Sequence, residues 1–405
     1  MAKFFQGFVT VVSKDACDEQ KATADFVCLG ENDELILQKA IDKCVEENKN
    51  LYLANGVYHI DGFYDFQDGG PLTALCFPNC KREICVYGQS LTYGKGEGVC
   101  LYVSAKALES INEETVDVIR TTWTPKGMGS GSSLRIENIA IDISHNQKPI
   151  RAIDLRRCDR PELKQIKMGA YFDMPAGFGR PPAIAAKGCI GLTMTDGSNH
   201  SSSNYTNVHA TGFYEGIQVG GEHVVMINCS AIMCCYGYTF GNYQIRCGAN
   251  HPITMINCMD ERNVHLPLFN ACGDDDGNGA RLQGEQEVTM ISFNIERIAK
   301  QTPGGKLGDL MREVYPGTWK GNIGFTAQPA WCHLNEKNFQ IWENDGSGKG
   351  FITRNNCHKL ICGTEERESY YPTYGQQIFD TDLNKMLICI DPAAKKWVDF
   401  NGNEV

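Results

Sequence analysis

Two glutamates, Glu261 and Glu296, occupy equivalent places in two copies of a repeated strand. Each follows a short apolar strand by the same spacing, counted from Cys258 in one copy and Phe293 in the other. Stacked strands lie about 4.8 Å apart, so we expect the two glutamates to be neighbours. A carboxyl pair about 5–5.5 Å apart is the arrangement of a retaining glycosidase. Because Arg262 follows Glu261 and an arginine also follows Glu296, an inert Glu–Arg ladder is the alternative.

A second acidic group, Asp274, Asp275 and Asp276, is flanked by glycines. Its carboxylates could supply an acid and a base to a bound sugar, or oxygen ligands to calcium. A solvated acidic turn is the other interpretation. We predict no metal site, because the cysteines lack the paired spacing of a structural zinc site.

The cations that could hold an acidic sugar include Arg262 and Arg281, with Lys167 and Arg246 also available. None of them belongs to a recognisable pattern. His209 falls on a predicted strand, where a single histidine is usually a hydrogen-bonded structural residue.

Aromatic residues gather near the ends of consecutive repeats, and Tyr214, Tyr236 and Tyr238 are the candidates for contact with substrate. Their faces suit the apolar faces of sugar rings, while Asn and Asp edges bind the hydroxyl groups. The alternative is that they fill the interior of the protein or a trimer interface.

The repeat that would position these groups is an apolar strand followed by Asn and a small or apolar residue. Steps of 27, 42, 21, 29 and 35 residues separate its equivalent positions. A step in the twenties with variable additions is typical of one coil of a parallel β-solenoid. The longer steps contain insertions at 169–188 and 270–286, where binding surfaces are often built. The equivalent positions are Ile139, Ile166, Val208, Cys229, Cys258 and Phe293.

The N-terminal part predicts a helix that begins at Asn32, with Leu35, Ile36, Ala40, Ile41 and Cys44 on one apolar face. Strands follow at 50–53 and 57–60, separated by Asn55-Gly56. Together with the preceding Ala24-Asp25-Phe26-Val27-Cys28, this sequence resembles the N-terminal end of the β-helix in pectate-lyase-like right-handed parallel β-helix proteins. The resemblance implies an all-β solenoid capped by a short helix, as in phage tail spikes and carbohydrate-active enzymes.

The C-terminal segment reads Gly375-Gln376-Gln377-Ile378-Phe379-Asp380-Thr381, then Lys385, then Trp397-Val398-Asp399. It predicts a small β-hairpin module with polar turns. It also resembles a short module found at the C-terminus of phage tail and tail-fibre proteins. We therefore expect three parts: a leader or attachment segment at 1–30, a β-helix with corner insertions at 31–350, and the C-terminal module at 351–405.

The totals exclude several classes of partner. A formal charge of −11 and a pI near 5.4 argue against a nucleic-acid partner. No apolar run approaches the roughly 20 residues that span a bilayer, and no cleavable signal is present. The 19 cysteines predict free thiols that serve as small core residues. No motif indicates a cofactor.

These features favour a phage tail-spike-like virion protein that recognises a host cell-surface polysaccharide, with or without cleaving it. The resemblance implies a homotrimer that contacts other tail or baseplate proteins and is assembled in the host cytoplasm. The alternative is a bacterial β-helix carbohydrate-active enzyme, either a glycoside hydrolase or a polysaccharide lyase.

Overall fold

The computed structural model divides the chain into two compact units: Met1–Trp319 with Phe325–Ile352, and Lys320–Gly324 with Thr353–Val405. It describes residues 7–78, 82–91, 97–112, 114–123, 133–143, 145, 147–170, 185–194, 202–221, 223–240, 253–261, 263, 286–291, 293–298, 332–337, 339–344, 351–354, 359–369, 377–391 and 393–405.

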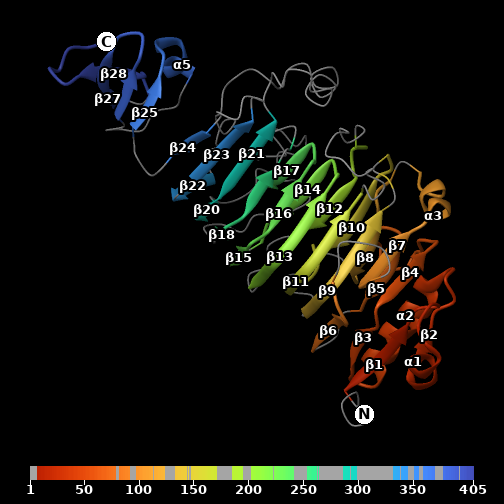
Figure 1. Cartoon of the computed structure of the whole chain (residues 1–405). Helices are drawn as coiled ribbons and strands as arrows, with labels where there is room; N and C mark the ends of the chain where they lie inside the picture. The colour runs from red at the N-terminus through yellow and green to blue at the C-terminus, as the bar shows by residue number, and fades with distance from the viewer. Residues whose placement is uncertain are drawn as a thin grey trace. The chain divides into compact units, whose positions relative to one another are not determined.

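The first unit is a parallel β-helix in which successive coils stack strand on strand (Figure 1). An 18-stranded sheet contains most of the strands. Within it, each coil supplies one strand before a tight turn and one strand after it, which we call the pre-turn and post-turn strands. The pre-turn strands are β1 (Phe8–Val12), β3 (Asn50–Leu53), β6 (Glu83–Gly88), β15 (Val224–Ile227), β18 (Ile253–Ile256), β20 (Gln286–Ile291) and β22 (Cys332–Lys337).

The post-turn strands continue each coil in the same direction. Three strands, β9 (Ser133–Ile143), β11 (Arg160–Gly169) and β13 (Ser203–Thr211), run through the turn and belong to both groups. The remaining post-turn strands are β4 (Gly56–Ile60), β7 (Val99–Val103), β16 (Ser230–Ile232), β19 (Met259–Glu261), β21 (Asn294–Ile298) and β23 (Phe339–Asn344). The same sheet also contains β2 (Phe26–Val27) and β24 (Phe351–Arg354).

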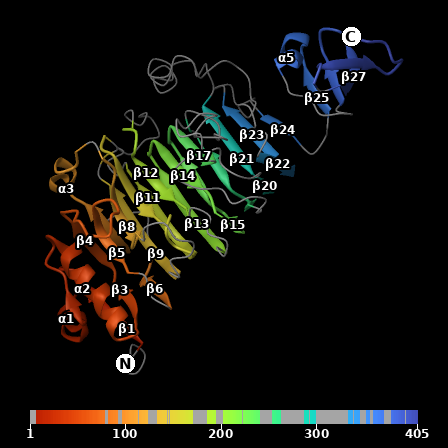
Figure 2. The ribbon, with the colours of Figure 1, turned by 180° about the vertical axis from the view of Figure 1, so that it is seen from behind.

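A second, six-stranded parallel sheet forms another side of the β-helix, and its strands are stacked in Figure 2. Its residues are almost all buried. Strands that are covered on both faces read as continuous runs rather than as an alternation of apolar and polar residues. The strands, in order, are β5 (Thr73–Phe77), β8 (Val116–Thr121), β10 (Ile150–Asp154), β12 (Ile190–Thr193), β14 (Glu215–Val219) and β17 (Tyr236–Phe240).

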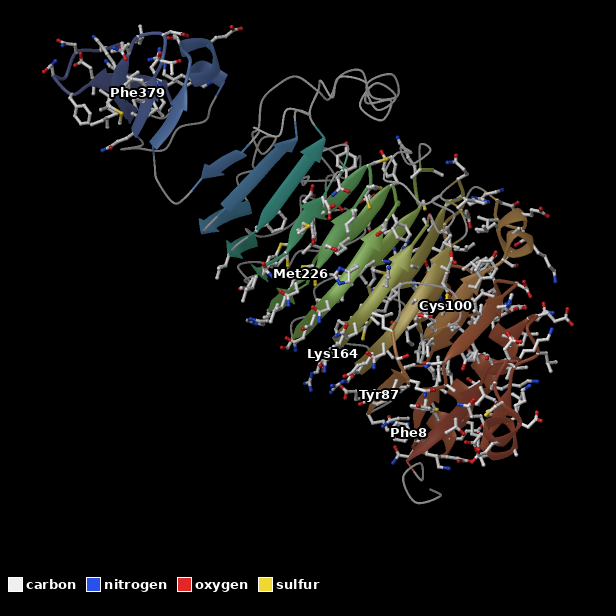
Figure 3. All side chains as sticks on the ribbon, viewed as in Figure 1. Phe8, Tyr87, Cys100, Lys164, Met226 and Phe379 are labelled. Carbon is white, nitrogen blue, oxygen red and sulfur yellow. The ribbon has the colours of Figure 1, made fainter. Side chains whose placement is uncertain are left out.

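The strand pairing confirms the predicted register of the repeat. Ile166 is paired with Ile139 on one side and with Val208 on the other. The later pairings of His209 with Ser230, of Ser230 with Met259 and of Met259 with Asn294 carry the same alignment through Cys229, Cys258 and Phe293. Figure 3 labels Phe8, Tyr87, Lys164 and Met226, which lie on every second level of the stack, on β1, β6, β11 and β15.

The repeated asparagines lie at the turn, where the backbone enters the left-handed region. The φ angles of Asn138, Asn207, Asn228 and Asn257 lie between 52° and 60°, and Gln165 takes the same conformation. Asparagine tolerates this region better than most residues. The Asn257 side chain donates a hydrogen bond to Oδ1 of Asn228 at 2.7 Å, so the turn asparagines of two consecutive coils bond to each other.

The predicted helix is α2 (Asp33–Glu46), and its buried face packs on the first coils. Leu37, rather than the expected Leu35, completes this face, and Leu35 is 44% exposed. Asn32 is the N-cap residue but its side chain makes no capping hydrogen bond. Instead, Asp33 accepts hydrogen bonds from the backbone N–H groups of Leu29, Gly30 and His59.

The segment before α2 contains strands as well as the short helix α1 (Asp18–Thr23). Strand β1 pairs in parallel with β3, and β2 pairs with β1. The residues from Phe8 to Val27 therefore contribute to the first coil. The attachment role of residues 1–30 stays a prediction. Between β7 and β8 lies one more helix, α3 (Ala105–Glu109).

The second unit contains the predicted C-terminal hairpin. Strands β26 (Gln377–Asp380), β27 (Lys385–Asp391) and β28 (Lys396–Asp399) pair antiparallel in sequence order. β25 (Lys359–Cys362) pairs in parallel with β26, and α5 (Thr364–Ser369) follows β25. A small core holds the unit together and consists of Ile378, Leu387, Cys389 and Trp397.

The interior of the β-helix is apolar and includes many thiols. The cysteine side chains that the structure describes are free and, apart from Cys17, are buried. Cys229 and Cys258 stack on consecutive coils, and each lies close to a backbone carbonyl oxygen of the interior. This confirms, for the described cysteines, that they serve as small core residues.

Candidate functional site

Glu261 and Glu296 are paired in register on β19 and β21, as the repeat predicts. Neighbouring strands bring their backbones to about 4.8 Å from each other. The Glu261 side chain is partly exposed, and the Glu296 side chain lies outside what the structure describes. The separation of the two carboxyl groups and their catalytic role stay predictions. Arg262, Asp274, Asp275, Asp276 and Arg281 also lie outside the described residues.

The three candidate tyrosines divide into two kinds. Tyr214 and Tyr236 are partly exposed, and their rings form an edge-to-face pair with centroids 6.0 Å apart. Tyr238 is fully buried, and its hydroxyl donates to the carbonyl oxygens of Cys229 and Met259 at 3.0 and 3.1 Å. Tyr238 therefore fills the interior, which corrects its expected role, because an interior side chain cannot contact a ligand on the outer surface.

The exposed tyrosine pair lies at one end of a line of polar residues that the sequence did not reveal. On β8, β10, β12, β14 and β17, the same two positions, three residues apart, are paired from one coil to the next, and most of the residues there are polar. We call the residues at these two positions the polar track. The track comprises Asp117, Arg151, Ile190, Glu215 and Tyr236 at the first position, and Arg120, Asp154, Thr193, Gln218 and Thr239 at the second.

The N-terminal half of the track is a buried charge network. Asp154 accepts hydrogen bonds from Arg151 at 2.8 Å and from Arg156 at 2.6 Å. Nε of Arg151 lies 3.5 Å from Asp117. Asp117, Arg151 and Asp154 are each at most 2% exposed. Buried charges need such partners, because removing an ion from water costs several kcal/mol.

Burial and charge push the pKa values of the two aspartates apart. Burial, with the nearby charge of Asp154, raises the pKa of Asp117 above its usual range. Burial would also raise the pKa of Asp154, but Arg156 and Arg151 hold it well below its usual range. Asp154 is therefore held in its ionised form between two guanidinium groups.

Further polar contacts extend this half of the track. Arg120 donates two hydrogen bonds to Asp68, at 2.6 and 2.8 Å. The guanidinium groups of Arg156 and Arg157 lie 4.5 and 4.8 Å from the ring centre of Trp123. A cation near the face of tryptophan is attracted by its π electrons. These contacts close off the charge network and give it a structural role.

The C-terminal half of the track is uncharged except for one carboxylate. Oε2 of Glu215 accepts hydrogen bonds from Gln218 at 3.0 Å and from Thr239 at 2.7 Å. The Gln218 carbonyl in turn accepts the hydroxyl of Thr193 at 2.7 Å. Tyr236 is paired in register with Glu215, so the carboxylate adjoins the tyrosine pair. This end therefore combines two partly exposed aromatic rings with a carboxylate that the buried Gln218 and Thr239 side chains hold in place.

Glycines allow the coils to stack closely at this end of the track, where Tyr214, Glu215 and Tyr236 form a corner of the β-helix. Gly191, Gly216 and Gly237 occupy the same register position, one residue after Ile190, Glu215 and Tyr236. A Cβ on Gly191 would collide with the carbonyl oxygen of Gly216, and a Cβ on Gly216 would collide with that of Gly237. Only glycine lets the coils approach this closely. The spacing of these glycines was the available sequence signal for the corner.

Within the residues that the structure describes, no group of three His, Cys, Asp or Glu side chains could hold a metal ion. None of the described helices is long and apolar enough to cross a membrane.

The comparisons with known proteins do not assign a family. No family model and no curated protein matches the chain. Among solved structures, ORF18 of Geobacillus virus E2 is similar at 9% identity and a TM-score of 0.36, over 91% of this chain and 82% of that one. Tailspike protein 3 of bacteriophage CBA120 is similar at 9% identity and a TM-score of 0.16, over 91% of this chain and 67% of that one. TM-scores this low carry no argument, so the fold rests on the strand pairing.

Proposed function

We propose that this chain is a phage tail-spike-like virion protein that recognises a host cell-surface glycan at the corner formed by Tyr214, Glu215 and Tyr236. The observation that carries the proposal is the partly exposed tyrosine pair beside a carboxylate held by Gln218 and Thr239. Aromatic rings stack on sugar faces, and carboxylate groups bind sugar hydroxyls. The resemblance of the C-terminal segment to phage tail modules supports the virion assignment.

The proposal also covers partners. A tail-spike-like protein would form a homotrimer and attach to other tail or baseplate proteins. A mass measurement in solution tests the oligomer, and a monomer at all concentrations would count against the trimer.

The binding test uses an array of capsular polysaccharides and lipopolysaccharides purified from diverse bacteria. We expect the wild-type protein to bind at least one glycan, and Tyr214→Ala and Tyr236→Ala each to weaken binding about tenfold, as for a binding hot spot. Tyr102→Ala is the matched control, because Tyr102 also makes a partly exposed edge-to-face pair, with His59, on another part of the β-helix. Equal affinity of all four proteins would refute the corner as the binding site.

A second candidate function is a carbohydrate-active enzyme, either a hydrolase or a lyase. The observation that favours it is the register pairing of Glu261 with Glu296 on neighbouring strands. Cleavage would release reducing ends, or unsaturated uronates that absorb ultraviolet light. Loss of this release in Glu261→Gln would support the enzyme. A bound glycan that keeps its full length during long incubation would exclude the enzyme for that glycan.

A further inference from the structure

A column of hydrogen-bond donors lies on the post-turn strands. Lys167 on β11 is paired in register with His209 on β13, and His209 is paired with Ser230 on β16. The three residues therefore occupy one position on three consecutive coils, about 4.8 Å apart. Lys167 and His209 are partly exposed, and Ser230 is 7% exposed.

The contacts within the column prepare it to donate hydrogen bonds. Nδ1 of His209 lies 2.6 Å from Oγ of Ser230. When the serine hydroxyl donates to Nδ1, the proton of the neutral ring is on Nε2, and this N–H becomes the donor. Burial lowers the pKa of Lys167, and burial together with the charge of Lys167 lowers the pKa of His209. An anion bound between Lys167 and His209 would stabilise their charged forms and so raise both pKa values.

No acidic residue shares this position among the described strands. The neighbours in the same row are Ala140 before Lys167, and Met259 after Ser230. Acids occupy the next positions along these strands: Asp260 and Glu261 follow Met259, and Asp142 is paired with the residue two positions after Lys167.

The column adjoins the corner that carries the tyrosines. Five residues lead from His209 to Tyr214, a reach of about 17 Å at most. Six residues lead from Ser230 to Tyr236 on the next coil. His209 and Ser230 therefore share their coils with Tyr214 and Tyr236, on the two sides of one corner, and Lys167 lies on the coil before them.

We propose that Lys167 and His209, with the His209 ring oriented by Ser230, bind an oxyanion, namely the carboxylate, sulfate or phosphate group of an acidic glycan. The oxyanion site stands on its own geometry, whereas the assignment to a glycan rests on the proposed function. The tyrosine pair then holds a sugar ring while the column holds an acidic group of the same chain. This makes acidic polysaccharides the preferred class of ligand over neutral ones.

The test measures how fast single side chains are modified in the wild-type protein. Trace acylation of lysines and carbethoxylation of histidines are read by peptide mass spectrometry, with sodium sulfate or with sodium chloride of equal ionic strength. We expect sulfate at twice its Kd to slow labelling of Lys167 and His209 about threefold, since protection equals one plus the ratio of ligand to Kd. Lys164 on the same strand and His223 are exposed controls and should not change. Equal slowing at the controls, or none at Lys167, would overturn the oxyanion site.

Two variants and two polymers complete the test. Lys167→Met should remove the protection of His209 by sulfate, and Lys164→Met should leave it unchanged. Polygalacturonate should protect Lys167, and neutral dextran should not. Protection by sulfate but not by polygalacturonate or by any acidic glycan bound on the array would overturn the glycan assignment alone. Tyr214→Ala separates the two proposals, because it should weaken glycan binding and leave the protection by sulfate intact.

Discussion

Removing the charge of Asp154 should destabilise the β-helix far more than removing a surface charge. Asp154→Asn keeps the shape of the side chain but leaves Arg151 and Arg156 without the carboxylate that both contact. Arg151 is 2% exposed, so water does not replace that carboxylate. Breaking a buried ion pair by removing one partner costs about 3–5 kcal/mol.

The loss is partly offset by the neighbouring acid. The charge of Asp154 helps to raise the pKa of Asp117, so its removal favours ionised Asp117, which lies 3.5 Å from Arg151. We therefore expect the lower part of the range for Asp154→Asn at neutral pH. The double variant Asp117→Asn/Asp154→Asn should lose more than the sum of the single variants, with a coupling of about 0.5–3 kcal/mol.

Unfolding by heat or guanidinium, followed by circular dichroism, measures these differences. For a unit of about 350 residues, unfolding entropy near 2.1 cal/mol/K per residue converts about 3 kcal/mol into a fall in Tm of about 4 °C. The control is Glu47→Gln, which removes an exposed ion pair with Lys49 and should cost less than about 1 kcal/mol. If Asp154→Asn costs no more than Glu47→Gln, the charge network does not stabilise the fold.

Two further predictions concern the turn and the acid limit of stability. Asn228→Ala should lower the free energy of unfolding by about 1–2 kcal/mol, because the φ of 54° at this position strains most residues. Asn228→Gly should lower it less, because glycine adopts this conformation freely. Equal losses for the two variants in equilibrium unfolding would exclude backbone strain as the cause. Burial alone would raise the pKa of Asp68, but hydrogen bonds from Arg120 and from the Trp123 backbone hold it below 3.8. Its stabilising contribution is therefore present above pH 3.8 and lost as the pH falls through the lower pKa of the folded state, so a plot of Tm against pH should be flatter below pH 4 for Asp68→Asn than for wild type.

The coil register was predictable because it depends on residues with a local constraint. The turn requires a left-handed residue, and Asn207, Asn228 and Asn257 mark it in the sequence. The apolar residue after each asparagine is buried, as Cys229 and Cys258 show. Such positions repeat with every coil whatever the length of the insertions between them, so a few matches align the whole solenoid.

The six-stranded sheet was harder to predict for a physical reason. Its strands are four to six residues long and are buried on both faces, so they lack the alternation that identifies a half-buried strand. The segment Ile150–Asp154 contains an arginine and an aspartate, which suggests a surface loop until Asp154 is seen to pair with two arginines. Side-chain pairing between coils decides this burial, and a single sequence does not show which partners meet.

The two halves of the polar track indicate where a ligand would bind. In the half around Arg151 and Asp154, hydrogen bonds and ion pairs already connect the charged groups, and burial excludes water. A ligand would have to replace these contacts before it gained any of its own. At the corner, Tyr214 and Tyr236 are partly exposed, so a sugar ring would displace only water. The Lys167–His209 column is also partly exposed, and an anion there would gain charge-assisted hydrogen bonds. Ligand binding is therefore expected around the corner, while the buried charges keep the coils that carry it in register.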